Sequence, residues 1–155
     1  MSARAPLVTA ALALLVITAA PAPAQSPPPK VVDPAIASGQ AAKDLAAARA
    51  LWKRTGPRSY RYRIAVQCFC VRREAPTITV RGGRPVGGRK AADDTSTLPR
   101  LFRAVDGAIA GGAASLKVTY DRRYGFVRTL WVDREVYIAD EEFGYKVDRF
   151  RALTR

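Results

Sequence analysis

The sequence predicts an α+β domain in which two helices pack on one face of an antiparallel sheet. Two segments carry apolar residues at the spacing of a helix, and several short segments alternate apolar and polar residues, as half-buried strands do. The strand-like segments follow one another in runs with short turns between them, which favours antiparallel pairing. The predicted order of elements is α-β-β-β-α-β-β-β-β.

The chain begins with a stretch typical of a secretory signal peptide, residues 1–24. Leu7–Ala20 is apolar and uncharged, and Pro21 ends it. As a helix this stretch would span roughly 21 Å, which is shorter than the ~30 Å hydrocarbon core of a membrane. Ala22–Ala24 fits the small-x-small cleavage pattern, so we expect cleavage before Gln25 and export to the periplasm or the medium. An uncleaved membrane anchor is the alternative.

The remainder of the chain has the length of one domain. Residues 25–36 are rich in proline and poor in apolar side chains, and they predict an extended tether. The folded domain is then expected over residues 37–155.

The first predicted helix is Ser38–Arg54, with Ser38 as its N-cap and Gly56-Pro57 after its end. It is rich in alanine, and its larger apolar residues include Trp52, which we expect to dock the helix on the sheet.

The first strands follow from Ser59 onward. Alternate residues of the first strand form one apolar face, which we expect to be buried: Tyr60, Tyr62, Ile64, Val66, Cys68 and Cys70. A second strand, Thr77–Arg81, is predicted to turn at Gly82-Gly83 and to return over Arg84–Arg89, because glycine permits the positive φ of a tight hairpin. Residues 90–95 read as a polar loop.

The second predicted helix runs from Leu98 to Ala110. Its apolar residues form one stripe, with Thr97 as a candidate cap, and Gly111-Gly112 ends it. Four strands are predicted to complete the sheet: Leu116–Tyr120, Phe126–Val132, Val136–Ile138 and Tyr145–Phe150.

The chain is strongly basic, with 26 lysines and arginines against 13 acidic residues and a net charge of +13. This charge favours an acidic partner, such as an anionic envelope polymer or an acidic protein. The basic residues are scattered over every segment, and export would separate the protein from nucleic acids, so we expect no nucleic-acid partner. We expect no transmembrane segment after cleavage.

The sequence contains no histidine, which excludes Ser-His-Asp and Cys-His nucleophiles and histidine-bearing zinc sites. Two cysteines cannot complete an all-cysteine zinc site, and the glycine motifs of nucleotide sites are absent. We therefore assign no catalytic, cofactor-binding or metal-binding residue, and we expect no cofactor.

Cys68 and Cys70 are the only cysteines, and in an exported protein such a pair is expected to oxidise. Residues i and i+2 of a regular strand lie about 6.6 Å apart, whereas a disulfide needs Cβ atoms about 3.8 Å apart. A bulge or strand end at Phe69 would therefore be needed. We predict a local disulfide that clamps this bend and adds about 1.5 kcal/mol. Buried free thiols, a thiol redox couple and a soft-metal site are the alternatives.

Asp140-Glu141-Glu142 forms an acidic turn in this basic chain. We interpret it as a charged turn that offsets neighbouring arginines. A calcium or magnesium site is one alternative, because hard cations prefer carboxylate oxygens. A carboxylate-based hydrolase, with Asp140 and Glu142 as the paired acids, is another.

The region from about Leu51 to Phe150 resembles domain-of-unknown-function family 6174, a family of small bacterial exported proteins. The resemblance is carried by motifs in the family's order: Trp52, Tyr60-x-Tyr62, Cys68-Phe69-Cys70, Leu101-Phe102, Tyr120-Asp121 with Tyr124-Gly125, and Ala139-Asp140-Glu141-Glu142-x-Gly144-Tyr145. Val127 stands where the family has a proline, and the anchoring cysteine of its lipoprotein-like members is lacking. The resemblance implies that the cysteine pair and the acidic turn belong to the shared fold, and it implies no activity.

Together these observations predict an exported, single-domain protein that is not an enzyme. We expect a binding or structural module of the cell envelope that works through a sheet face or its basic surface.

Overall fold

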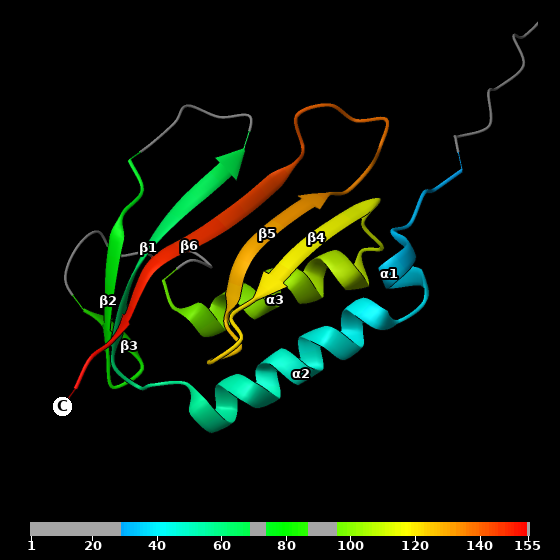
Figure 1. The fold of residues 1–155 in the computed structure, drawn as a ribbon. Coiled ribbons are helices and arrows are strands. Elements are labelled where there is room, and N and C mark those ends of the chain that lie inside the picture. The colour runs from blue at the N-terminus through cyan, green and yellow to red at the C-terminus, as the bar shows by residue number, and fades with distance from the viewer. Residues whose placement is uncertain (1–28, 69–73, 87–95, 155) are drawn as a thin grey trace, which may run out of the picture.

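The computed structural model describes residues 29–68, 74–86 and 96–154, which form an α+β domain with a six-stranded antiparallel sheet (Figure 1). The predicted signal peptide, Cys70 and the end of the predicted returning strand lie outside these residues. The elements in chain order are α1 (Pro34–Ala37), α2 (Gln40–Thr55), β1 (Tyr60–Cys68), β2 (Thr77–Arg81), β3 (Arg84–Val86), α3 (Leu98–Ala110), β4 (Ser115–Tyr120), β5 (Val127–Asp133) and β6 (Phe143–Ala152). None of the described helices is long and apolar enough to cross a membrane.

The strands are ordered β3-β2-β1-β6-β5-β4, and all described neighbours are antiparallel. The sheet therefore consists of two three-stranded meanders that meet where β1 pairs with β6. This central pair joins the two halves of the chain and brings Cys68 opposite Phe143. The register shifts between Arg61 and Arg63, where Arg149 of β6 has a φ of 51°.

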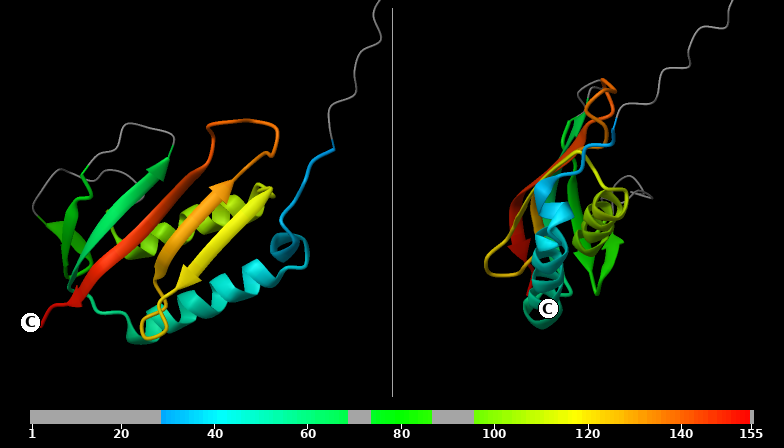
Figure 2. Two further views of the ribbon diagram at one scale, coloured as in Figure 1. Left: turned by 45° about the horizontal axis from the view of Figure 1, so that its top comes forward. Right: turned by 90° about the vertical axis from the view of Figure 1, so that its right-hand side faces the viewer.

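Both long helices lie on the same face of the sheet, because both contact Tyr60. The Trp52 ring of α2 packs edge-on against the Tyr60 ring, with 5.6 Å between the ring centres, which confirms that Trp52 docks α2 on the sheet. The Tyr60 hydroxyl also accepts a hydrogen bond from Leu98 N–H at the start of α3 (3.2 Å). In the edge-on view of Figure 2, α3 covers one side of the strands and no described helix covers the other.

The core fills the space between this face and the helices. Its fully buried side chains include Tyr62, Ile64, Leu98, Leu101, Val105, Phe126, Leu130 and Val132. The apolar stripe predicted over Leu98–Ala110 is therefore the buried face of α3. Thr97 occupies the N-cap position but makes no side-chain cap hydrogen bond.

The first long helix begins later than predicted, because the chain turns before it. Ser38 closes the short helix α1, and Gly39 then adopts a φ of 75° and is the N-cap of α2. A positive φ at this position favours glycine.

Part of the predicted tether lies against the domain. Asp33 Oδ1 accepts from Ala35 N–H (2.8 Å) and so caps α1, while Asp33 Oδ2 accepts from Leu116 N–H (2.9 Å). The Lys30 ammonium donates to Gly111 O at the end of α3 (2.7 Å). Residues from Lys30 onward are thus fastened to the junction of α3 and β4.

The strand predicted over Val136–Ile138 is wrong, since these residues form turns in the loop between β5 and β6. Within residues 111–154, three strands rather than four follow α3. The loop exposes Val136, Tyr137 and Ile138 by 56%, 66% and 49%, so their apolar character does not reflect burial.

Candidate functional site

The residues singled out in the sequence come together in one cleft of 820 Å³ between α3 and one end of the sheet. Cys68 reaches this cleft from the end of β1, and Asp140, Glu141 and Glu142 reach it from the loop between β5 and β6. Figure 1 shows that this loop and the end of β1 lie at the same end of the sheet.

The cleft exists because small residues of α3 face the ends of β1 and β6. Ala104, Gly107 and Ala108 line its helical wall, and Phe143 and Tyr145 of β6 line the opposite one. Side chains of this size on α3 leave the end of the sheet uncovered.

Because α3 leaves this end of the sheet uncovered, the prediction that the apolar face of β1 is buried along its whole length is wrong. Its alternate residues are buried as far as Ile64, but Val66, on the same face, is 56% exposed. Cys68 is half-buried at the wall of the cleft, and no described cysteine is a free thiol.

The acidic turn presents carboxylates to the cleft at different depths. Asp140 is exposed and has a φ of 72°, whereas Glu141 and Glu142 are half-buried. Glu141 Oε1 and Glu142 Oε2 are inaccessible to solvent and have no hydrogen-bond partner among the described residues. Among all the residues that the structure describes, no three acidic or cysteine side chains are grouped closely enough to hold a metal ion.

Basic side chains also line the cleft, so positive and negative charges lie close together around the acidic turn. The Arg134 guanidinium stands 5.1 Å from the centre of the Phe143 ring. Lys30, from the segment before α1, and Arg103, from α3, also line the cleft. Acidic and basic side chains thus share the cleft, and the charge-offset interpretation of the turn stays a prediction.

A second candidate surface is the open face, which we define as the outward-pointing side chains on the side of the sheet opposite the helices. Strand alternation and pairing register place basic residues on all but one of the paired rows: Arg61, Arg63, Arg81, Arg84, Lys117, Lys146 and Arg151. All of these are exposed except Arg63, which is half-buried. Asp133 and Asp148 are the acidic residues that register places on the same face.

One aromatic residue lies among these charges. Trp131 pairs with Lys117 of β4 on one side and with Gly144 of β6 on the other. A Cβ added to Gly144 would lie 3.1 Å from Trp131 Cε3 and 3.4 Å from Gln67 Oε1. Gly144 is itself buried, and the indole and the Gln67 amide lie close to it where the sheet has no side chain. The scatter of arginine and lysine along the sequence concealed this surface, which only the strand register assembles.

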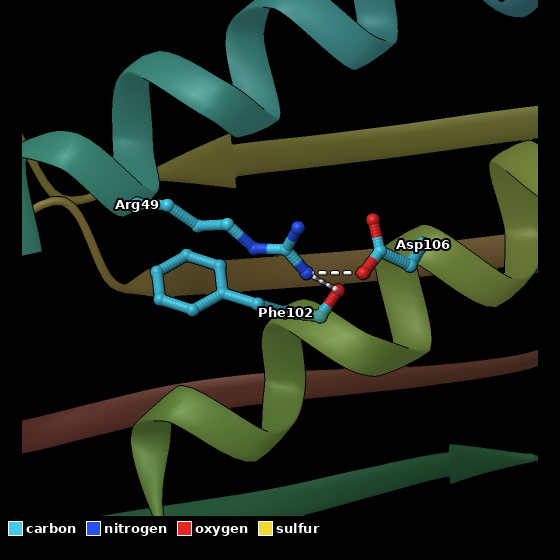
Figure 3. A network of polar contacts seen from close by, with 3 residues as sticks. All are labelled: Arg49, Phe102 and Asp106. Atoms are coloured by element: carbon cyan, nitrogen blue, oxygen red, sulfur yellow. Dashed lines mark hydrogen bonds and ion pairs between the residues drawn. The ribbon is translucent and has the colours of Figure 1, made fainter.

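A third polar cluster joins the two long helices and is best explained as structural (Figure 3). Arg49 of α2 forms an ion pair with Asp106 of α3 and also donates to Phe102 O (3.3 Å). Burial raises the pKa of the nearby Tyr120 to about 12, with Asp44 and Asp106 adding to the rise and Arg49 opposing it.

The fold thus defines a small α+β domain with a helix-covered face, an open basic face and a cleft at one end. A family model described as a family of unknown function (DUF6174) matches residues 44–152, and the chain belongs to this family. This confirms the family that the motifs indicated. Neither a curated protein nor a solved structure matches the chain significantly.

Proposed function

We propose that the protein is an exported, non-enzymatic binding module of the cell envelope that holds an anionic polymer on its open face. The observation that carries this proposal is the gathering of seven basic side chains, against two acidic ones, on one solvent-facing side of the sheet.

The spacing of these charges suits a polymer better than a small anion. Neighbouring strands lie about 4.8 Å apart and alternate residues of a strand about 6.6 Å apart, so the charges form a broad lattice. Each exposed contact is weak in water, and affinity requires several at once. A chain with repeated negative charges meets that condition.

The test is binding of a polyanion, such as polygalacturonate or polyphosphate, measured by calorimetry at increasing salt. We expect affinity to fall at least about tenfold between 50 and 200 mM salt. Reversing two charges of the open face, as Arg61→Glu with Lys146→Glu, should abolish binding. The matched control is Lys43→Glu with Arg54→Glu, which changes the net charge equally at exposed positions of α2. Salt-independent binding, or equal loss in the two double variants, contradicts the proposal.

The cleft supports a second candidate function, the carboxylate-based hydrolase. Asp140 and Glu142 both line it, together with the aromatic rings of Phe143 and Tyr145. The variants Asp140→Asn and Glu142→Gln should each remove a hydrolytic activity found by substrate screening. An activity that survives both substitutions excludes this function.

For the cysteines we propose a Cys68–Cys70 disulfide that clamps the end of β1. The absence of a free thiol among the described cysteines supports it. Intact mass after alkylation without reductant should show no added alkyl group. Two added alkyl groups would refute the disulfide and favour the thiol redox or soft-metal alternative.

For export, we expect N-terminal sequencing of the secreted protein to give Gln25 as its first residue.

A further inference from the structure

We infer that the polymer on the open face is an acidic polysaccharide, and that one of its sugar rings stacks on Trp131. This inference rests on the proposed function and names the ligand class for the same surface.

Trp131 has the position that such a contact needs. It lies within the row formed by Lys117, Trp131, Gly144 and Gln67 across four neighbouring strands. Its ring is half-buried and lies against the buried Gly144, where a Cβ would stand only 3.1 Å from Trp131 Cε3. The absence of a side chain at Gly144 leaves room for the indole against the sheet, and a ring of the ligand can stack on the part of the indole that stays exposed.

The surroundings of the indole offer hydrogen bonds as well as charge. Gln67 presents an amide beside Gly144. The Thr119 and Thr129 hydroxyls, 2.6 Å apart, lie on the adjoining row. Amide and hydroxyl groups can both donate to and accept from the hydroxyls of a sugar.

Lysines lie on two sides of Trp131. Lys117 is directly opposite Trp131, and Lys146 is two residues beyond Gly144 on β6. Neighbouring cross-strand positions are about 5 Å apart and diagonal ones about 7–8 Å. A carboxylate on the stacked sugar or on the next one would fall within reach of these ammonium groups.

A sugar fits this spot better than a nucleobase or a bare phosphate chain. The C–H bonds of a pyranose face carry partial positive charge and complement the negative face of an indole. Proteins that hold single-stranded nucleic acid stack successive bases on several aromatic side chains. Trp131 is the only aromatic residue that register places on the open face of the described strands. A polyphosphate has no ring to stack.

The test compares three oligomers of equal charge, namely oligogalacturonate, linear polyphosphate and single-stranded DNA, by calorimetry with the purified protein. A stacking contact on Trp131 predicts that oligogalacturonate binds roughly tenfold more tightly than polyphosphate, which corresponds to about 1.4 kcal/mol. Trp131→Ala should remove this difference and leave polyphosphate binding unchanged, while Trp131→Phe should retain part of it. Tyr137→Ala, which removes an exposed aromatic ring from the loop between β5 and β6, is the control and should bind as the unaltered protein does.

The outcomes separate the inference from the proposed function. Equal affinity for oligogalacturonate and polyphosphate, or a preference that survives Trp131→Ala, overturns the sugar contact and leaves the anionic surface standing. Preferential, Trp131-dependent binding of DNA overturns it in favour of nucleic acid. Absence of binding to all three oligomers overturns both.

Discussion

The carboxylate of Asp33 accepts a hydrogen bond from the backbone N–H of Leu116, 2.9 Å away and 83 residues later in the chain. The same side chain caps α1 through Ala35 N–H, and the Asp33 N–H donates to Ala113 O (2.9 Å). One residue thus holds the segment before α2 against the first buried position of β4.

Replacing Asp33 with alanine should lower the free energy of unfolding by about 2 kcal/mol, since it removes a helix cap and leaves a partly buried N–H without an acceptor. Urea denaturation measures this change. Ser38→Ala is the control, because the Ser38 hydroxyl bonds Ala35 O only at 3.4 Å on an exposed surface. A loss of stability equal to that of the control would mean that the Asp33 contacts contribute nothing to stability.

The elements that were predicted correctly are those whose pattern of apolar residues or turn residues is local in the sequence. The stripe of α3 and the hairpin at Gly82-Gly83 both match the structure. Val136–Ile138 was mistaken for a strand because three consecutive apolar residues suggest burial, although they show no alternation and are exposed. Contacts such as that between Asp33 and Leu116 join segments that are distant in the sequence, so no periodic pattern predicts them.

The candidate sites depended on pairing that the sequence does not display. The acidic turn and Cys68 meet because β6 pairs with β1 across most of the chain. The open face has the same origin, since its arginines and lysines come from β1, β2, β3, β4 and β6 and gather only through register. Alternation predicted which residues point outward, but not which strands are neighbours.

The Arg49–Asp106 ion pair joins the long helices but should contribute little through charge alone. The side chains are 41% and 50% exposed, and exposed pairs contribute up to about 1 kcal/mol. We expect Asp106→Asn to cost about 0.5 kcal/mol. Arg49→Met should cost more, because it also removes the hydrogen bond to Phe102 O and the cation over the Phe102 ring. A double-mutant cycle, measured by urea denaturation, separates the ion pair from the contacts of Arg49 with Phe102. Equal losses of stability in the two single variants would show that the Phe102 contacts add nothing.

Tyr60 and Tyr120 should respond oppositely to loss of the hydroxyl. The Tyr60 hydroxyl accepts from Leu98 N–H, so Tyr60→Phe leaves a buried donor unpaired and should cost about 1–2 kcal/mol. The Tyr120 hydroxyl oxygen is buried without a partner among the described residues, so Tyr120→Phe should leave stability unchanged or raise it. Denaturation of the two variants at neutral pH is the measurement, and a larger loss for Tyr120→Phe would contradict it.

The same two tyrosines predict how stability depends on alkaline pH. Burial raises the pKa of Tyr60 to about 12, with the Leu98 hydrogen bond opposing, and burial likewise raises the pKa of Tyr120 to about 12. Both phenols hold their proton more tightly in the folded chain than in the unfolded chain, where the pKa is about 10. Their contribution is therefore complete below pH 10 and is lost as the pH rises from about 10 to 12. Melting temperatures should fall across this window, less steeply for Tyr120→Phe. If the melting temperature of Tyr120→Phe falls with pH as steeply as that of the unaltered protein, Tyr120 is not a cause of the alkaline loss of stability.

Gly144 and Gly107 offer the sharpest contrast between two identical substitutions. A Cβ at Gly144 would stand 2.5 Å from the backbone oxygen of Leu130, which cannot move without disturbing β5, so Gly144→Ala should cost about 1–3 kcal/mol. A Cβ at Gly107, in the middle of α3, would meet no atom within 4 Å, and Gly107→Ala should instead stabilise the helix by roughly 0.5–1 kcal/mol. Because Gly107 lines the cleft and Gly144 borders Trp131, the pair also separates the two surfaces. Gly107→Ala should leave polyanion binding intact, whereas Gly144→Ala should weaken the preference for oligogalacturonate by displacing the indole. Loss of stability in both variants would show that α3 packs more tightly at Gly107 than its surroundings indicate.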